Sequence, residues 1–196
     1  MAVVTYTSVF FLSLILILSV SHACDPFNSK QFKEECDKTP HPEYCLRLVK
    51  ARIDDSMSYH IYSPQDMAQY LMCLAAGIGH ELTALARAEG DRLPKGSAQQ
   101  RCMEKCAAGF DAAASKLDIV DGKLLENRRE TFDLVYRFVQ SKAGALAQDW
   151  NACPGRPATG VMVSKQKQFA MLMDIVLALG KLPDGGCASS QFSIGL

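Results

Sequence analysis

The stretch Cys36–Cys45 reads CDKTPHPEYC, and it decides more about the fold than any other part of the sequence. Its two cysteines enclose a threonine and two prolines, a composition typical of a tight turn. In an oxidising compartment, a disulfide between Cys36 and Cys45 would close this turn. The flanking segments predict two short helices, at about Ser29–Cys36 and Pro42–Met57, so we expect a disulfide-linked helical hairpin.

Residues 1–23 predict a secretory signal peptide. Phe10–Val20 is almost wholly apolar, and Ser21 and Ala23 place small residues at the −3 and −1 positions of a cleavage site. The apolar run is shorter than the ~20 residues that a transmembrane helix needs. We therefore expect a secreted, extracellular protein whose mature chain, Cys24–Leu196, keeps no stable membrane association after cleavage.

The mature chain is long enough to form one domain with a hydrophobic core of its own. It carries 21 basic and 21 acidic residues, so its formal net charge is zero. A neutral chain without a basic patch gives no electrostatic reason to bind nucleic acid or an anionic membrane. We therefore exclude nucleic acid from the expected partners.

Four longer segments predict amphipathic helices, because their apolar residues recur every three or four positions. The segments begin at Ser63, Ser97, Asn127 and about Ser164, and the first three of these residues are favourable helix N-caps. The expected core positions are Met67, Leu71, Leu74, Ile78, Leu82 and Leu85; Cys106, Phe110, Ala113, Leu117, Val120 and Leu124; Phe132, Val135, Val139, Leu146 and Trp150; and Phe169, Leu172, Val176 and Leu179. We predict an all-α fold: an N-terminal helical hairpin followed by an up-down-up-down four-helix bundle, stapled by disulfides.

Eight cysteines remain after signal cleavage: 24, 36, 45, 73, 102, 106, 153 and 187. Residues bonded across an antiparallel helix pair must lie at the same level. Cys153 follows the third long helix, so its partner should lie near the start of the second. Both Cys102 and Cys106 meet this requirement, and the pairing of Cys24, Cys73 and Cys187 stays open.

The sequence offers little that could carry catalysis. The mature chain has three histidines, His41, His60 and His80, in no zinc-binding spacing. His80 stands beside Glu81, but adjacent side chains on a helix point in different directions. No glycine-rich phosphate loop or nucleotide motif is present. We predict that the protein is not an enzyme and uses no cofactor or metal.

The cysteine stretch resembles the opening signature of the plant invertase and pectin methylesterase inhibitor family. That signature, Cys-X-X-Thr-X-X-Pro-X-X-Cys, is filled by Cys36, Thr39, Pro42 and Cys45. A second family pattern places a cysteine before an aromatic residue, an alanine and a leucine at helical spacing. This pattern is matched by Cys106, Phe110, Ala113 and Leu117, and less well from Cys102.

The resemblance implies a mature domain, 24–196, that docks on a cell-wall carbohydrate-active enzyme and blocks its cleft. A pectin methylesterase or an acid invertase would be the partner, in the apoplast. The resemblance also implies Cys153 as the fourth family cysteine, bonded to Cys106, with Cys102 as the alternative partner.

The same resemblance places the contact surface on the second and third bundle helices, with Glu104 and Asp111 as candidate contacts. Methylesterase inhibitors usually carry a threonine directly before the fourth cysteine and an acidic residue two positions after it. This chain has Ala152 and Gly155 at those positions, which we keep as candidate contacts. The family's acidic positions after the third cysteine are partly replaced, by Ala108 and Ala112, so the chain resembles a divergent member.

A different binding function is the alternative. A helical scaffold of this kind could hold a small apolar ligand without inhibiting any enzyme. Its adaptable lining would then be the methionines of the first and last long helices, Met67, Met72, Met171 and Met173. The competing interpretation is that these side chains fill the core, and we favour it.

Overall fold

The computed structural model describes residues 27–53, 61, 63–122, 132–142, 153 and 160–182. Within these ranges the regular secondary structure is helical, which confirms the all-α prediction. The signal segment lies outside the described residues, and so do Asn127, Leu146 and Trp150. No helix of the described residues is long and apolar enough to cross a membrane.

The N-terminal hairpin consists of α2 (Ser29–Cys36) and α3 (Pro42–Ile53). The Asn28 side chain accepts hydrogen bonds from the Lys30 and Gln31 amides, while Gln31 bonds back to the Asn28 amide. This capping box fixes the start of α2. Cys36 and Cys45 form a disulfide with a Cα–Cα distance of 5.5 Å, which joins the end of α2 to the first turn of α3.

The turn between these helices explains the residue types in the signature. Thr39 is buried, and its hydroxyl donates a 2.7 Å hydrogen bond to the Cys36 carbonyl, which also accepts a 3.0 Å hydrogen bond from the Thr39 amide where α2 ends. Pro42 opens α3, at a position where a missing backbone N–H costs nothing. The threonine, the proline and the disulfide therefore act on the same short turn.

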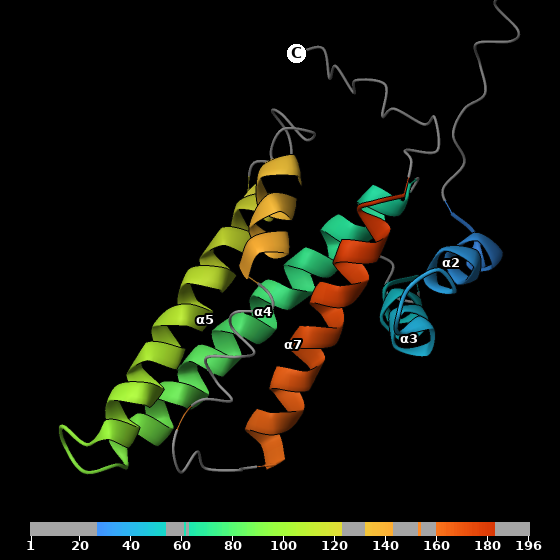
Figure 1. Cartoon of the computed structure of the whole chain (residues 1–196). Helices are drawn as coiled ribbons and strands as arrows, with labels where there is room; N and C mark the ends of the chain where they lie inside the picture. The colour runs from blue at the N-terminus through green and yellow to red at the C-terminus, as the bar shows by residue number, and fades with distance from the viewer. Residues whose placement is uncertain are drawn as a thin grey trace, which may run out of the picture.

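The long helices α4 (Pro64–Asp91) and α5 (Ala98–Gly122) form an antiparallel pair (Figure 1). Ser63 caps α4 by accepting a hydrogen bond from the Asp66 amide, and Ser97 caps α5 in the same way through Gln100. Gly96 has φ +72°, a backbone conformation that suits glycine, and it reverses the chain between the two helices.

The last described helix, α7 (Gly160–Leu179), lies antiparallel to α4. Glu81 of α4 pairs with Lys165 near one end of α7, and Gln65 donates a hydrogen bond to the Leu182 carbonyl beyond the other end. The expected start near Ser164 is wrong by about one turn. Met162 is fully buried, so packing of its side chain carries the helix back to Gly160.

Residues 132–142 form a further helix, drawn in orange in Figure 1. Tyr136 in this helix donates a 3.0 Å hydrogen bond to the Leu177 carbonyl of α7. The directions of α4, α5 and α7 agree with the expected bundle. The complete up-down-up-down order stays a prediction, because the third bundle helix is described only over these residues.

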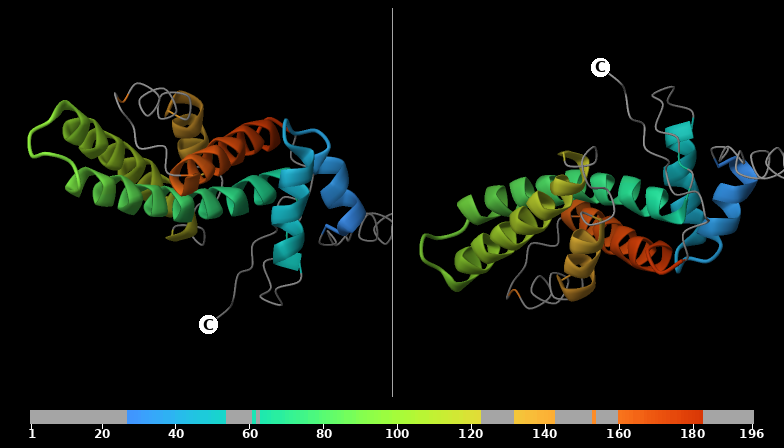
Figure 2. Two further views of the ribbon diagram at one scale, coloured as in Figure 1. Left: turned by 90° about the horizontal axis from the view of Figure 1, so that it is seen from below. Right: turned by 90° about the horizontal axis from the view of Figure 1, so that it is seen from above.

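Most of the predicted apolar positions that the structure describes lie in the core. The others, which pack against it partly exposed, are Leu74, Ile78, Leu85 and Phe132. The fully or nearly buried ones are Met67, Leu71, Leu82, Cys106, Phe110, Ala113, Leu117, Val135, Val139, Phe169, Leu172, Val176 and Leu179. Phe110 and Phe169 meet edge to face across α5 and α7, with ring centroids 6.0 Å apart. Figure 2 shows the α2–α3 hairpin at the end of this body, beside the start of α4 and the end of α7.

Candidate functional site

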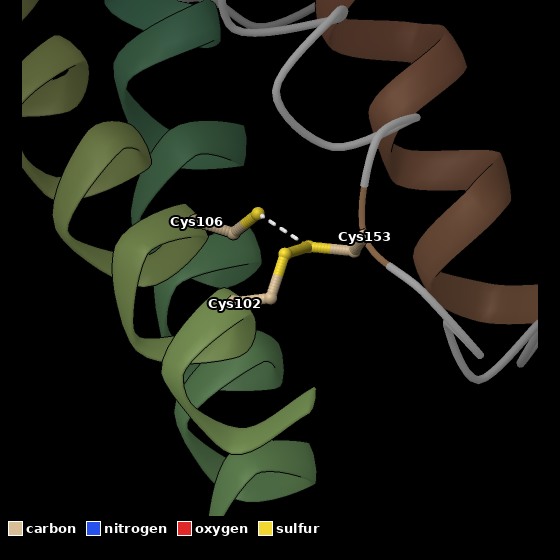
Figure 3. A group of neighbouring side chains, drawn as sticks. All are labelled: Cys102, Cys106 and Cys153. Atoms are coloured by element: carbon tan, nitrogen blue, oxygen red, sulfur yellow. Dashed lines mark hydrogen bonds between the residues drawn. A yellow bond between two sulfur atoms is a disulfide. The ribbon is translucent and has the colours of Figure 1, made fainter. Parts of the chain in front are cut away.

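Three sulfur atoms gather where α5 begins its second turn (Figure 3). Cys102 and Cys153 form a disulfide with a Cα–Cα distance of 5.7 Å. The Sγ of Cys106 lies 3.5 Å from the Sγ of Cys153, and the three sulfurs are all within 4.8 Å of one another. We call Cys102, Cys106 and Cys153 the sulfur cluster.

The structure corrects the preferred partner of Cys153. The family resemblance favoured Cys106, whereas the bond runs to the alternative, Cys102. Both cysteines lie on one face of α5, a single helical turn apart, so helical periodicity cannot separate them. The tertiary position of Cys153 decides, since it lies within bonding distance of Cys102 and leaves Cys106 in non-bonded contact.

The sulfur cluster has the residue types of a soft-metal site, but its oxidation state does not fit one. A metal binds thiolate sulfur, and two of these three sulfurs are held in a disulfide. Cys106 alone would offer a single thiolate, which is too few ligands for a stable metal site. In this state the cluster is suited to disulfide chemistry.

A second feature lies on another face of α5, where it meets α4. An open groove of about 390 Å³ is lined by Arg87, Glu104, Ala107, Ala108, Asp111, Ala112 and Ser115. We call it the α4–α5 groove. Both acidic residues that the family resemblance singled out, Glu104 and Asp111, lie on its walls.

The α4–α5 groove carries more acidic than basic side chains. Arg87 of α4 donates a 3.3 Å hydrogen bond to a carboxylate oxygen of Asp111, and both side chains are about half exposed. Glu104 lies two turns from Asp111 along the same face of α5, and it is exposed. Two carboxylates against one guanidinium leave the groove with a net negative charge.

The floor of the groove is made of small side chains. Ala107 is buried, whereas Ala108 and Ala112 are exposed. These two alanines stand where the family resemblance expects acidic residues, so the groove is more open and less negative than that pattern implies. Ala152 and Gly155, the remaining candidate contacts, lie outside the described residues.

The turn between α2 and α3 contacts α7. The His41 Nε2 lies 3.2 Å from a carboxylate oxygen of Asp174, which links the loop after α2 to the C-terminal half of α7. Burial raises the pKa of Tyr44, and the positive charges of Arg47 and Lys165 oppose this rise. Arg47 also lies over the Tyr44 ring, with its guanidinium carbon 5.3 Å from the ring centroid.

His80 and Glu81 point to different partners, as expected for neighbours on a helix. The His80 Nε2 lies 2.7 Å from Asp118 of α5, whereas Glu81 pairs with Lys165 of α7. Each side chain therefore links α4 to another helix. They do not converge on a common point where an acid and a base could act together.

Three of the four methionines proposed as a ligand lining are part of the packed interior, whereas Met171 is only partly buried. Met67 and Met72 are fully buried, and Met173 is 3% exposed. They belong to the same cluster of core side chains as Leu71 and Leu172. This placement supports the core-packing interpretation over the small apolar ligand.

The likeness of this chain to known proteins is structural. No protein-family profile matches the sequence, and no curated protein matches it. Among solved structures, the chain is similar to a pectin methylesterase inhibitor from Arabidopsis thaliana. The two share 16% identical residues with a TM-score of 0.49, over 80% of this chain and 99% of that chain.

Proposed function

We propose that this protein is a secreted inhibitor of the plant invertase and pectin methylesterase inhibitor type. It would bind a cell-wall carbohydrate-active enzyme and occlude its substrate cleft. Pectin methylesterase and acid invertase are the two candidate targets. The protein would carry no chemistry of its own in this role, so its action would be steric.

The observation that carries the proposal is the position of Glu104 and Asp111. The family resemblance selected both residues as contacts, and both line the α4–α5 groove. A concave surface with fixed charges is a suitable place for a protruding segment of a partner. The small side chains of Ala108 and Ala112 leave room for such a segment.

The rigidity of the groove supports the same proposal. The two helices that form it are linked by the hydrogen bond between His80 and Asp118 and by the ion pair Arg87–Asp111. A disulfide anchors the first turns of α5 to the segment that carries Cys153. Because little order has to be gained on docking, less binding free energy is lost to conformational entropy.

A double substitution tests the groove directly. Glu104→Ala with Asp111→Ala should weaken inhibition of the target enzyme by at least about 10-fold, the loss typical of removing central interface contacts. Glu34→Ala with Asp37→Ala is the matched control, since it removes two exposed carboxylates, one in α2 and one at its C-cap, away from the groove. Equal inhibition by both double variants would place the contact surface elsewhere on the protein.

A further inference from the structure

The sulfur cluster contains one sulfur more than its disulfide uses. The Cys106 Sγ lies 3.5 Å from the Cys153 Sγ, while Cys153 is bonded to Cys102. The two sulfurs are thus in contact, and attack needs a further movement that brings the Cys106 Sγ into line with the Cys102–Cys153 bond. Cys102 and Cys106 are one helical turn apart, so a modest movement of Cys153 along α5 would exchange one partner for the other.

We propose that Cys102, Cys106 and Cys153 form a thiol–disulfide exchange site. The Cys106 thiolate attacks the Cys153 Sγ, and a Cys106–Cys153 bond forms as the Cys102–Cys153 bond breaks. The bonding electron pair leaves with the Cys102 sulfur, which takes up a proton from solvent in place of the one that Cys106 released. The exchange is an isomerisation, so it needs no oxidant or reductant.

Exchange changes which sulfur solvent can reach. Cys106 is buried, with 5% of its surface exposed, and Cys153 is equally buried. Cys102 is only partly buried. Moving the disulfide to Cys106 therefore transfers the thiol from the interior of the protein to a position that small molecules can approach.

The chemical class that this site would take is a small disulfide. The Cys102 thiolate attacks one sulfur of oxidised glutathione, forms a mixed disulfide and releases one molecule of reduced glutathione. Each step breaks one sulfur–sulfur bond and forms another, so atoms and electrons balance. Modification of Cys102 therefore requires that Cys106 first displace it from the disulfide with Cys153.

Peptide mapping of the oxidised mature protein tests the exchange. Trypsin cleaves after Arg101 and after Lys105, so Cys102 and Cys106 fall on different peptides. The protein is incubated at pH 8, quenched with acid and mapped without reduction. We expect two linked species, Cys102–Cys153 and Cys106–Cys153, to interconvert after the pH is raised. Recovery of the Cys102–Cys153 link alone, at every incubation time, would overturn the proposal.

Labelling with oxidised glutathione gives a second readout. In the native protein, Cys102 should acquire glutathione at least about 10-fold faster than it does in Cys106→Ser, which has no sulfur to displace it. Equal labelling rates in the two proteins would refute the claim that Cys106 releases Cys102 for modification. This comparison does not require a variant with an altered disulfide to fold, because Cys106→Ser keeps the Cys102–Cys153 bond.

A third variant tests whether the second bonded state is accessible. Cys102→Ser should form the Cys106–Cys153 disulfide and keep the helical circular dichroism of the native protein. A folded Cys102→Ser protein with Cys106 and Cys153 both still alkylatable would show that the second state is inaccessible, and would contradict the proposal. If this variant does not fold, the native mapping and the labelling rates decide.

Discussion

Gly79 of α4 lies directly against Ala114 of α5. A Cβ placed on Gly79 would be 3.0 Å from the Ala114 Cβ and 3.6 Å from the Phe110 carbonyl oxygen. The absent side chain therefore lets the two helix backbones approach closely. This contact sets the spacing of α4 and α5, and through it the shape of the α4–α5 groove.

Two glycine substitutions in α4 should have different effects on stability. Gly77→Ala meets no atom within 4 Å, so it should raise the free energy of unfolding by about 0.5–1 kcal/mol through helix propensity. Gly79→Ala gains the same propensity but overpacks the helix contact, and should be less stable than Gly77→Ala by about 1–3 kcal/mol. Urea denaturation of both variants measures the difference, and equal stabilities would show that the helices can move apart at no cost.

The buried turn of the hairpin should depend on the hydroxyl of Thr39. Thr39→Val keeps the shape of the side chain but leaves the Cys36 carbonyl without that donor, and should cost about 1 kcal/mol of stability. Thr39→Ser retains the hydroxyl and is the matched control. If denaturation curves show that the valine variant is as stable as the serine variant, the Thr39 hydrogen bond does not stabilise the turn.

The link between the helix of residues 132–142 and α7 should depend on Tyr136. Its hydroxyl donates to the Leu177 carbonyl, and its ring covers Gly180, where an added Cβ would collide with the ring. Tyr136→Phe should therefore lower the free energy of unfolding by about 1 kcal/mol at neutral pH. Calorimetry on the two proteins checks this, and an unchanged melting temperature would argue against the contact.

Stability should also fall in alkaline solution. Burial raises the pKa of both Tyr44 and Tyr136 above the ordinary value, because it disfavours the charged phenolate. A raised folded-state pKa gives a contribution that is complete below the unfolded pKa of 10.0 and is lost as pH rises through the folded value. Tyr44→Phe with Tyr136→Phe should lose less stability than the native protein between about pH 9 and pH 11. Parallel losses in rapid denaturation measurements would exclude the tyrosines as the cause.

Filling the α4–α5 groove should abolish docking without unfolding the protein. Ala112 is exposed, so Ala112→Arg adds a long side chain to the groove floor at little cost in stability. Inhibition should fall at least about 10-fold, because the added side chain would occupy space that the partner needs at the centre of the contact. Ala51→Arg, on the exposed surface of α3, supplies the same charge away from the groove. Retained inhibition by the Ala112 variant would show that the groove is not the contact surface.

Local sequence rules predicted the hairpin well, because its determinants are close together in the chain. Cys36, Thr39 and Pro42 act within one turn, and the expected bounds of α2 agree with the structure. The start of α7 was harder to predict. Gly160 is a poor helix former, and burial of Met162 against the rest of the protein outweighs that preference.

Helical periodicity alone could not predict the two features to which we assign a function, the α4–α5 groove and the sulfur cluster. Cys102 and Cys106 share one helix face, so only the position of Cys153 selects between them. The acidic residues of α5 were recognised from the family resemblance, but Arg87 was not. Arg87 lies beside Asp111 because of the register between α4 and α5. This register could not be predicted from the sequence.

The central claim is inhibition, and one measurement tests it most directly. The oxidised mature protein is added to a plant pectin methylesterase and to an acid invertase, side by side, at pH values from about 4.5 to about 7. The account predicts that one of the two enzymes is blocked at a stoichiometric ratio. Full activity of both enzymes, in the presence of folded protein with the Cys36–Cys45 and Cys102–Cys153 bonds verified, would contradict it.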